Sequence, residues 1–367
     1  MKRLRSFSIK DLPVKPLAWA LGFGLPGGLV FQACGLPMPW LLGPMTFTLA
    51  ATLWFESRKG PRLGVPEPLR KLALFLIGGV IGGSFASGTL DRAGDWPWTL
   101  AAMLVFVVVC AVVMTAWLHY GARFPMGTAL YSSLPGGLAT IMALAQEKGG
   151  DVRRVAAVHG IRIIAVVFVL PVVVSTGLGL DTVPSAAVEA APVLWMDVLE
   201  FVAIGLAGFG LAKLVRFPAP YMTGPIMAGA IAHLAGWSDA RLPAEAQVAC
   251  FLIMGSAIGC RFAGTSLREL AAIAKAALVG VLVLLPMAAV WSWVVAEVLG
   301  LDPVAVLLAF APGGVFEMCL IALALGIDPA FVAFHHLVRL VFLLIAAPLV
   351  LPRVAALLER RPPVGED

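Results

Sequence analysis

The sequence has little charge for its length. Charged residues make up 13% of the 367 residues, whereas soluble domains carry about 25%. Hydrophobic residues account for 60%, and the mean hydropathy is +0.97. Apolar runs of about 17–25 residues, each long enough to cross a bilayer core, recur along the whole chain. These proportions exclude a soluble globular protein and predict an all-α polytopic membrane protein whose surroundings are the lipid bilayer.

Paired cysteines and metal-ligand spacings are also lacking. The five cysteines are scattered singly, without a C-x-x-C pair: Cys34, Cys110, Cys250, Cys260 and Cys319. We therefore expect packed apolar thiols, no resident metal and no cofactor. The net charge of +5 does not indicate nucleic acid as a partner, because the excess Lys and Arg lie in short loops and tails, where they set membrane topology.

The N-terminus lacks the features of a cleaved signal peptide. No apolar run precedes Leu17, and no small-residue cleavage site follows early. Residues 1–15 are therefore expected to form a retained basic tail, which the positive-inside rule places in the cytoplasm. Residues 353–367 carry further arginines and are expected to be a second cytoplasmic tail.

An internal duplication is present. Adding 177 to a residue number matches helix breakers, a cap, a His and an Arg: Asp151 with Asp328, His159 with His336, Arg162 with Arg339 and Pro171 with Pro348. Early in each half the offset is 181, and we expect the loop after the second segment to absorb the four residues, because loop length varies cheaply. The repeats are predicted at 16–178 and 192–352, with Asp151 and Asp328 as N-caps of their last helices.

The fifth of six hydrophobic segments in each repeat contains Pro-Gly-Gly. If all six crossed the membrane, the connections 148–154 and 176–195 would violate the positive-inside rule. The violations disappear if segment 125–147 enters and turns back, since each arm of about ten residues spans roughly 15 Å and reaches only mid-membrane. This predicts two inverted-topology repeats, each with five transmembrane helices plus one re-entrant helical hairpin. The alternative is twelve crossings in two parallel repeats.

Pro-Gly-Gly suits the tip of such a hairpin. Pro ends one arm, and glycines reach the positive φ values that a tight turn needs. The second arm would point the positive end of its dipole at the midplane, which favours an anion there. The alternative is an ordinary Pro-Gly kink in a packed helix. The two tips are Pro135-Gly136-Gly137 and Pro312-Gly313-Gly314, and a related run, Leu25-Pro26-Gly27-Gly28, predicts a break in the first segment.

Ionisable groups recur inside the last helix of each repeat. His159 and Arg162 share a helical face, and His336 and Arg339 repeat the pair. An Arg at this depth costs at least a few kcal/mol, so it should face a cavity or a partner. Arg162 and Arg339, with the glycines of both tips, are candidate substrate ligands; the alternative is that each Arg caps hairpin carbonyls. The histidines are candidate proton relays or core histidines, and the two tip prolines are candidate gating elements.

One carboxylate within the apolar arm of a predicted hairpin has no counterpart in the other repeat. Glu317 lies five residues after Pro312, where the first copy has Thr140. A lone carboxylate in an apolar arm should be paired or protonated. We expect its partner to be Arg339, Arg162 or a coupling cation, and its role to be coupling or gating.

The two copies resemble a known family. LPGGLATIMALAQEKGGDVRRVAAVHGIRIIAVVFVLP and APGGVFEMCLIALALGIDPAFVAFHHLVRLVFLLIAAPLVLP look like the duplicated AbrB-type bacterial membrane protein family, over almost the whole chain. The family's pattern of Pro-Gly-Gly followed by Glu is met by Pro312, Gly313, Gly314 and Glu317, whereas the first copy departs from it at Thr140. The resemblance implies a protein of the bacterial cytoplasmic (inner) membrane and supplies no substrate.

The leading hypothesis is a secondary transporter of a small organic anion, a carboxylate, coupled to H⁺ or Na⁺, because inverted repeats with broken helices are typical of such proteins. One family label suggests a membrane monooxygenase instead, which needs clustered metal ligands. Only His335 and His336 of the five histidines are adjacent, and neighbours on a helix point about 100° apart. The other label suggests a membrane regulator or sensor. Enzymatic activity is not expected, and a homo-oligomer is compatible with the sequence.

Overall fold

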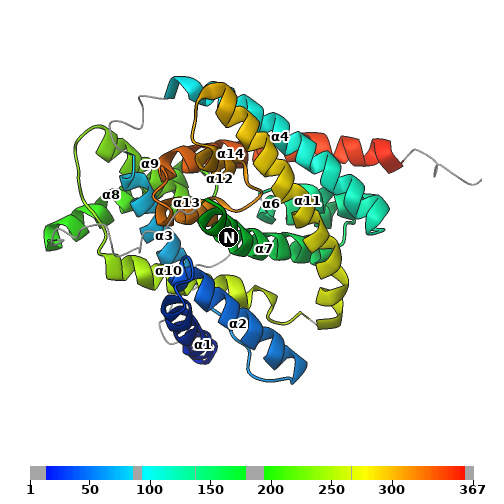
Figure 1. The fold of residues 1–367 in the computed structure, drawn as a ribbon, viewed down its shortest axis with the longest axis horizontal. Coiled ribbons are helices and arrows are strands. Elements are labelled where there is room, and N and C mark those ends of the chain that lie inside the picture. Colours follow the sequence, from blue (N-terminus) through cyan, green and yellow to red (C-terminus); the bar gives the residue numbers. More distant parts are fainter. Residues whose placement is uncertain (1–13, 86–92, 137, 179–193, 266, 360–367) are drawn as a thin grey trace, which may run out of the picture.

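The structure is a computed structural model that describes residues 14–85, 93–136, 138–178, 194–265 and 267–359. Every regular element in these ranges is a helix, as Figure 1 shows. Most of the predicted tails 1–15 and 353–367, and the tip residue Gly137, lie outside the described residues.

The described helices form two sets of seven that match in order. The first set is α1 (Val14–Ala33), α2 (Pro39–Ser57), α3 (Glu67–Gly83), α4 (Trp96–Ala116) continued by η3 (Trp117–Gly121), α5 (Met126–Ser133), α6 (Leu138–Glu147) and α7 (Val152–Leu178). The second set is α8 (Trp195–Leu214), α9 (Pro220–Leu234), α10 (Ala244–Gly259) continued by η4 (Cys260–Phe262), α11 (Leu267–Leu299), α12 (Pro303–Phe310), α13 (Val315–Ala324) and α14 (Pro329–Glu359).

Seven of the described helices are long and apolar enough to cross a bilayer: α1, α4, α7, α8, α10, α11 and α14. The helices α3 and α9 are shorter, with 17 and 15 residues. The prediction of an all-α polytopic membrane protein is confirmed.

The backbone repeats in detail between the two sets. Residues with positive φ recur at the two sequence offsets: Gly35 with Arg216 and Met38 with Ala219 at 181, and Arg123 with Gly300 and Gly149 with Gly326 at 177. Non-glycine residues rarely adopt positive φ, so this recurrence shows that the two sets share local conformation as well as sequence.

The length difference between the repeats lies in a helix. Lys59 and Gly236 both have positive φ and match at 177, so the offset has already changed by that point. The helix α2 has 19 residues and α9 has 15, whereas the connections 58–66 and 235–243 are equally long. The prediction that a loop absorbs the four residues is therefore wrong. Four residues are about one helical turn, so the extra turn keeps the buried face of α2 in register.

Glycines bring neighbouring helices into backbone contact. A Cβ on Gly27 of α1 would meet the backbone of Gly43 of α2, and the same holds for Gly208 of α8 and Gly224 of α9. The helix α1 runs unbroken through Pro26, so the predicted break in the first segment is wrong. The glycines after Pro26 make room for α2 instead. These two pairs form the lower and left edges of the molecule in Figure 1.

The two sets pack on each other reciprocally. A Cβ on Gly78 of α3 would lie 2.7 Å from the Met222 carbonyl oxygen of α9, and one on Gly255 of α10 would clash with the Leu41 carbonyl of α2. Gly255 and Gly78 match at 177, and Met222 and Leu41 at 181. Gly78 thus contacts Met222, and the counterparts of these two residues contact each other. Such reciprocal contacts are typical of two-fold symmetry.

The matching helices α3 and α10 run in opposite directions. Val80, near the end of α3, packs in one cluster with Ala246 at the start of α10. Arg70, at the start of α3, interacts electrostatically with Arg261, just past the end of α10. The helices α3 and α10 are therefore antiparallel.

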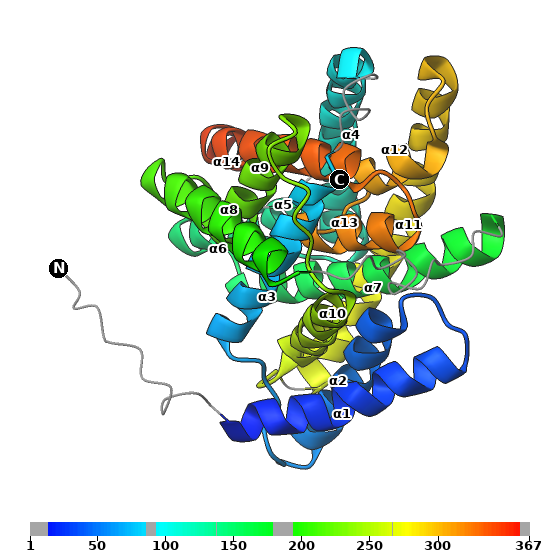
Figure 2. The same ribbon diagram turned by 90° about the vertical axis from the view of Figure 1, so that its left-hand side faces the viewer.

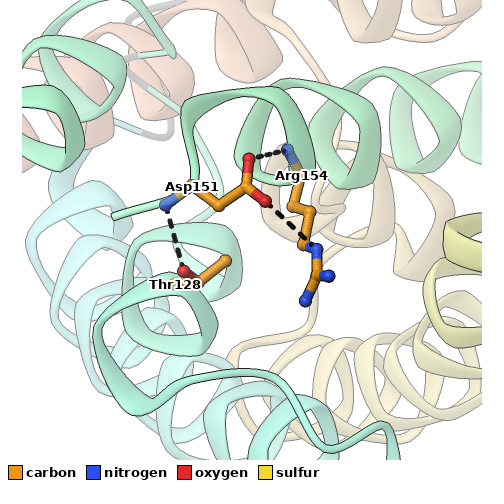
Figure 3. Close-up of polar contacts among 3 residues, drawn as sticks. All are labelled: Thr128, Asp151 and Arg154. Carbon is orange, nitrogen blue, oxygen red and sulfur yellow. Dashed lines mark hydrogen bonds and ion pairs between the residues drawn. The ribbon is translucent and has the colours of Figure 1, made fainter. Parts of the chain in front are cut away.

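The helices α5 and α6 form a hairpin. The backbone N–H of Asp151, which follows α6, donates to Thr128 Oγ1 in the first turn of α5 at 3.1 Å (Figure 3). Both open ends of the hairpin therefore lie together, whereas its tip at Leu134 is bound by Arg162, three helical turns further along α7. The helices α12 and α13 have the same lengths, 8 and 10 residues, and α13 lies near the centre of the molecule in Figures 1 and 2.

Candidate functional site

The tip of the second hairpin is held by Arg339. Its Nη1 donates to the carbonyl of Ala311 at 2.8 Å, and its Nη2 donates to the carbonyl of Gly313 at 2.7 Å. The residue is 3% exposed. The last carbonyls of a helix have no partner within that helix. The break after α12 therefore leaves buried carbonyl groups that need a hydrogen-bond donor. The planar guanidinium, with several N–H groups, supplies it.

Arg162 does the same for the first hairpin with looser geometry. Its Nη2 donates to the Leu134 carbonyl at 2.8 Å, and its Nη1 reaches the Ser133 carbonyl at 3.4 Å. Arg162 is 2% exposed, and its Nε and the hydroxyl of Ser132 have no hydrogen-bond partner among the described residues. Both arginines cap hairpin carbonyls in this structure, and their role as substrate ligands stays a prediction.

The two histidines also differ in how many of their ring nitrogens are hydrogen-bonded, and the second repeat again has more bonds. His336 accepts a hydrogen bond from Arg339 Nη2 at Nδ1 (2.7 Å) and donates from Nε2 to the Leu308 carbonyl (2.9 Å). His159 donates from Nδ1 to the Val155 carbonyl at 2.9 Å, and its Nε2 is buried without a partner in the described part of the chain. A neutral His with Nδ1–H carries its lone pair on Nε2. His159 is thus the histidine with a free acceptor.

The two arginines approach each other at the middle of the molecule. They interact electrostatically with one another and with the thiol of Cys110 on α4. No salt bridge to a carboxylate is formed by either guanidinium in the described residues. Two buried cations without a counter-ion form a locally positive centre, which favours an anion nearby.

The tip glycines serve different needs in the two copies. Gly136 has a φ of +128°, which only glycine adopts readily, as predicted. In the second tip the expected positive φ is wrong, because Gly314 has a φ of −82° and Gly313 is not in the positive region either. Gly314 is needed for space: a Cβ there would occupy the position of the Glu317 carboxylate.

The carboxylate of Glu317 covers the start of α13. Glu317 lies in the first turn of that helix, is 8% exposed, and folds back over Gly314. Negative charge at a helix N-terminus is stabilised by the helix dipole. The protein's own carboxylate therefore lies at the N-terminus of α13 in this structure, and binding of a substrate anion at this tip stays a prediction.

The two arginines predicted as partners of Glu317 are not its partners, whereas the third candidate, a coupling cation, stays a prediction. Neither Arg162 nor Arg339 pairs with it, since their bound donors go to the carbonyls and His336. The positive charge that acts on Glu317 belongs to Arg261 of η4. The sequence analysis missed Arg261. The comparison that singled out Glu317 would have found it, because Arg261 replaces Ser84 of the first repeat at the same offset of 177.

The two caps are confirmed. Asp151 Oδ1 accepts from the Arg154 N–H at 3.1 Å, and its other oxygen pairs with the Arg154 side chain (Figure 3). Asp328 Oδ1 accepts from the Ala330 N–H at 2.9 Å. Each aspartate starts the helix that carries one Arg–His pair, so it fixes the depth of that pair relative to the hairpin.

The adjacent His335 is held by other groups. Its Nδ1 donates to the Phe331 carbonyl at 2.8 Å, and its Nε2 accepts from Thr99 Oγ1 of α4 at 2.7 Å. Both ring nitrogens are thus used by the protein, as are those of His336. No group of three or more His, Cys, Asp or Glu side chains able to hold a metal occurs among the described residues. Four cysteines are buried as expected, but Cys34 is exposed.

A groove of about 470 Å³ lies apart from these polar groups, between α4, α5 and α14. Its walls are apolar residues such as Val107, Leu130 and Leu343. It reflects a difference between the repeats: 67% of the spanning part of α7 is buried, against 22% of that of its counterpart α14.

Comparisons with known proteins place the chain among membrane proteins of one family. A family model described as "Transition state regulatory protein AbrB" matches residues 40–355. A Bacillus subtilis (strain 168) protein named "Uncharacterized protein YhjN" is 24% identical over 366 residues, which cover 93% of this chain and 92% of the relative. An Escherichia coli (strain K12) protein named "Putative regulator AbrB" is 28% identical over 324 residues, 87% of this chain and 90% of the relative.

Proposed function

The chain belongs to the AbrB family of membrane proteins, and we propose that it is a secondary transporter of small organic anions, carboxylates, driven by H⁺ or Na⁺. The observation that carries this proposal is the pair of helical hairpins whose interrupted tips meet buried arginines. Non-helical backbone survives at membrane depth only where protein or a water-filled cavity satisfies it. Transporters use such breaks to bind substrate near the midplane.

The arms of the hairpins have the right length for re-entry. Arms of 8 and 10 residues correspond to roughly 12 and 15 Å, about half of the hydrocarbon core. With α1, α2, α3, α4 and α7 crossing, each repeat has an odd number of crossings, and the second repeat is inverted. The antiparallel α3 and α10 support this arrangement. We propose further that both termini lie in the cytoplasm, in keeping with the positive-inside rule, and that the protein resides in the bacterial inner membrane.

The substrate site lies between the two tips. Arg162 and Arg339 supply positive charge there, and the tip segments Pro135-Gly136 and Pro312-Gly313-Gly314 supply backbone that can move. Because the guanidinium donors are held by tip carbonyls, substrate binding exchanges some of these bonds for bonds to the anion. Movement of a hairpin is thereby linked to occupancy, which is what gating requires.

The coupling cation is handled by Glu317 and the histidines. Glu317 is buried and folded over Gly314, so it can bind H⁺ or neutralise Na⁺ without a competing direct ion pair. His159, with its free Nε2, is the second proton acceptor; His336 is engaged on both sides and tunes Arg339.

Uptake into liposomes tests the proposal. Purified protein is reconstituted and preloaded with unlabelled acetate, lactate, succinate or citrate, and counterflow of the same labelled anion is measured with and without imposed pH and Na⁺ gradients. Protein-free liposomes and the exposed-site variant Arg268→Gln are the controls. We expect counterflow of at least one carboxylate; absence of counterflow for every organic anion would remove the proposal.

Two other functions have less support. The printed name of the E. coli relative calls that protein a regulator, and a sensor would bind an anion at the same site without moving it, so binding without counterflow would favour it. A membrane monooxygenase would require clustered metal ligands, and the engaged nitrogens of His335 and His336 give it no support.

A further inference from the structure

Two charged residues of the second repeat replace neutral residues at the matching positions of the first. Glu317 stands where the first repeat has Thr140, and Arg261 stands where it has Ser84. The two positions lie 56 residues apart in the sequence, on α13 and η4. In both cases a neutral hydroxyl residue is matched by a charged one, and the two charges are opposite in sign.

The elements that carry these two residues pack on the same helix. The element η4 packs on α7 at Gly160, where a Cβ would lie 3.3 Å from Arg261 Cδ and 3.1 Å from the Phe262 ring. The helix α13, which carries Glu317 in its first turn, also packs on α7. Arg261 interacts electrostatically with Glu317 and with His159, which precedes Gly160. The interior wall of α7 thus brings the two exceptional charges together.

The two charges differ in access. The side chain of Glu317 is buried, whereas Arg261 keeps exposed surface, and Arg70, a second exposed cation, is near enough to interact with it. Arg261 and Glu317 do not form a direct salt bridge among the described residues. Two exposed arginines therefore lie near a buried carboxylate that balances Arg261 without binding it directly.

We infer that Arg261, aided by Arg70, binds the carboxylate group of a small organic anion, and that Glu317 is the internal counter-anion with which this anion competes. The inference rests on the proposed function and names the residue at which the substrate first meets the protein. A guanidinium fork matches a carboxylate in two parallel hydrogen bonds. The group already balancing Arg261 is itself a carboxylate, so the charge and shape that suit the position are those of an organic acid.

Chemical labelling of Arg261 tests the inference without a known substrate. The full-length protein in lipid nanodiscs is treated with the anionic arginine reagent 4-sulfophenylglyoxal, and labelling of Arg261 is followed by mass spectrometry relative to the exposed Arg268. In Glu317→Gln we expect labelling of Arg261 to be roughly threefold faster or more, because the competing negative charge is removed. Glu297→Gln, which neutralises an exposed carboxylate at the end of α11, should leave the rate unchanged.

The wild type supplies a second measurement that needs no variant to fold. Succinate added at millimolar concentrations should slow labelling of Arg261 and not that of Arg268, and it should do so at lower concentration in Glu317→Gln. An unchanged labelling rate in a folded Glu317→Gln, or equal effects of succinate on Arg261 and Arg268, would overturn the inference.

The outcome separates this inference from the proposed function. If liposomes show counterflow and Arg261→Gln transports like the wild type, the proposed transport function is supported and the inferred role of Arg261 is contradicted. If no anion is transported but succinate protects Arg261 with the expected dependence on Glu317, the inferred binding site is supported and the proposed transport function is contradicted. Thr140→Val, at the matching position of the first hairpin, is the control that should alter neither result.

Discussion

The two hairpins have the same lengths and the same Pro-Gly-Gly tips, but they differ in how well their polar groups are satisfied. In the second hairpin Arg339 binds two carbonyls and His336, and Glu317 covers the start of α13. In the first, Arg162 makes one short and one long bond, and polar atoms of Arg162 and His159 stay unpartnered among the described residues. A buried polar atom without a partner costs about 1–3 kcal/mol.

The difference teaches which hairpin is anchored and which retains capacity for a ligand. A fully bonded polar network rigidifies a structure, whereas a partly bonded one is a place where a new partner gains free energy. The second hairpin is the fixed one in this conformation. The first has spare donors and acceptors close to two buried cations.

The largest expected effect comes from removing the arginines. Arg339→Met leaves the Ala311 and Gly313 carbonyls and His336 without a donor and should lower the free energy of unfolding by about 3–5 kcal/mol. Arg162→Met loses one good and one long bond and should cost about 2–3 kcal/mol. Both lose the same buried charge, so the difference reports the bonds. Thermal unfolding in detergent, with Arg268→Met as control, measures it, and equal losses would contradict the asymmetry.

The two histidines test the same difference between the hairpins with one substitution in each repeat. His336→Leu breaks two hydrogen bonds and should cost about 2–3 kcal/mol. His159→Leu removes one bond together with an unpartnered nitrogen, so the net change should stay within about 0.5 kcal/mol. If His159 relays protons, that variant keeps its stability and loses pH-driven uptake. A strong destabilisation by His159→Leu would show that its Nε2 has a structural partner.

A substitution of Glu317 distinguishes coupling to the cation gradient from binding of the substrate. Glu317→Gln should reduce concentrative uptake driven by an imposed pH or Na⁺ gradient by roughly tenfold, in the usual range of coupling free energies, with counterflow retained. Thr140→Val, its match in the first hairpin, should keep gradient-driven uptake. The assay is the liposome measurement described above, and gradient-driven uptake by Glu317→Gln at the wild-type level would exclude the coupling role.

The tip glycines should also respond differently. Gly136→Ala places a side chain at a φ of +128°, which should cost about 1–2 kcal/mol. Gly313→Ala meets the buried Met318 side chain, first at its terminal Cε, and because methionine is adaptable it should cost about 1 kcal/mol, the low end for overpacking. Unfolding free energies of the two variants decide the point, and the reverse order would show that the second tip is the strained one.

The smallest effect concerns pH and the cap of α14. Burial raises the pKa of Asp328, and the N–H groups of Ala330 and Phe331 lower it by less. A raised native pKa stabilises the fold fully below the unfolded value of about 3.9, and this contribution is lost as pH rises through the native pKa. Asp328→Asn retains the cap and cannot titrate. The stability of the wild type relative to this variant should therefore fall as pH rises; a constant difference would exclude the effect.

Much of this architecture follows from sequence pattern. The offset of 177 pairs Arg162 with Arg339 and His159 with His336, and the Pro-Gly-Gly runs mark where α5 and α12 end. These features are local or periodic, so each can be seen without knowing what lies nearby in space. The extra turn of α2 could not be located this way, because an insertion of one turn leaves the apolar pattern of a helix intact. The unbroken course of α1 through Pro26 could not be predicted either, because the glycines that follow Pro26 are needed for close contact with α2.

The amino-acid sequence alone determines that the protein is a membrane protein of two similar halves with paired buried arginines and one unmatched carboxylate, since hydropathy and repetition are properties of the chain itself. The tertiary structure decides that the arginines bind hairpin carbonyls and that Glu317 is balanced by Arg261. The reason is distance: Arg261 and Glu317 are brought together only where η4 and α13 both pack on α7, and no pattern along the chain encodes that meeting.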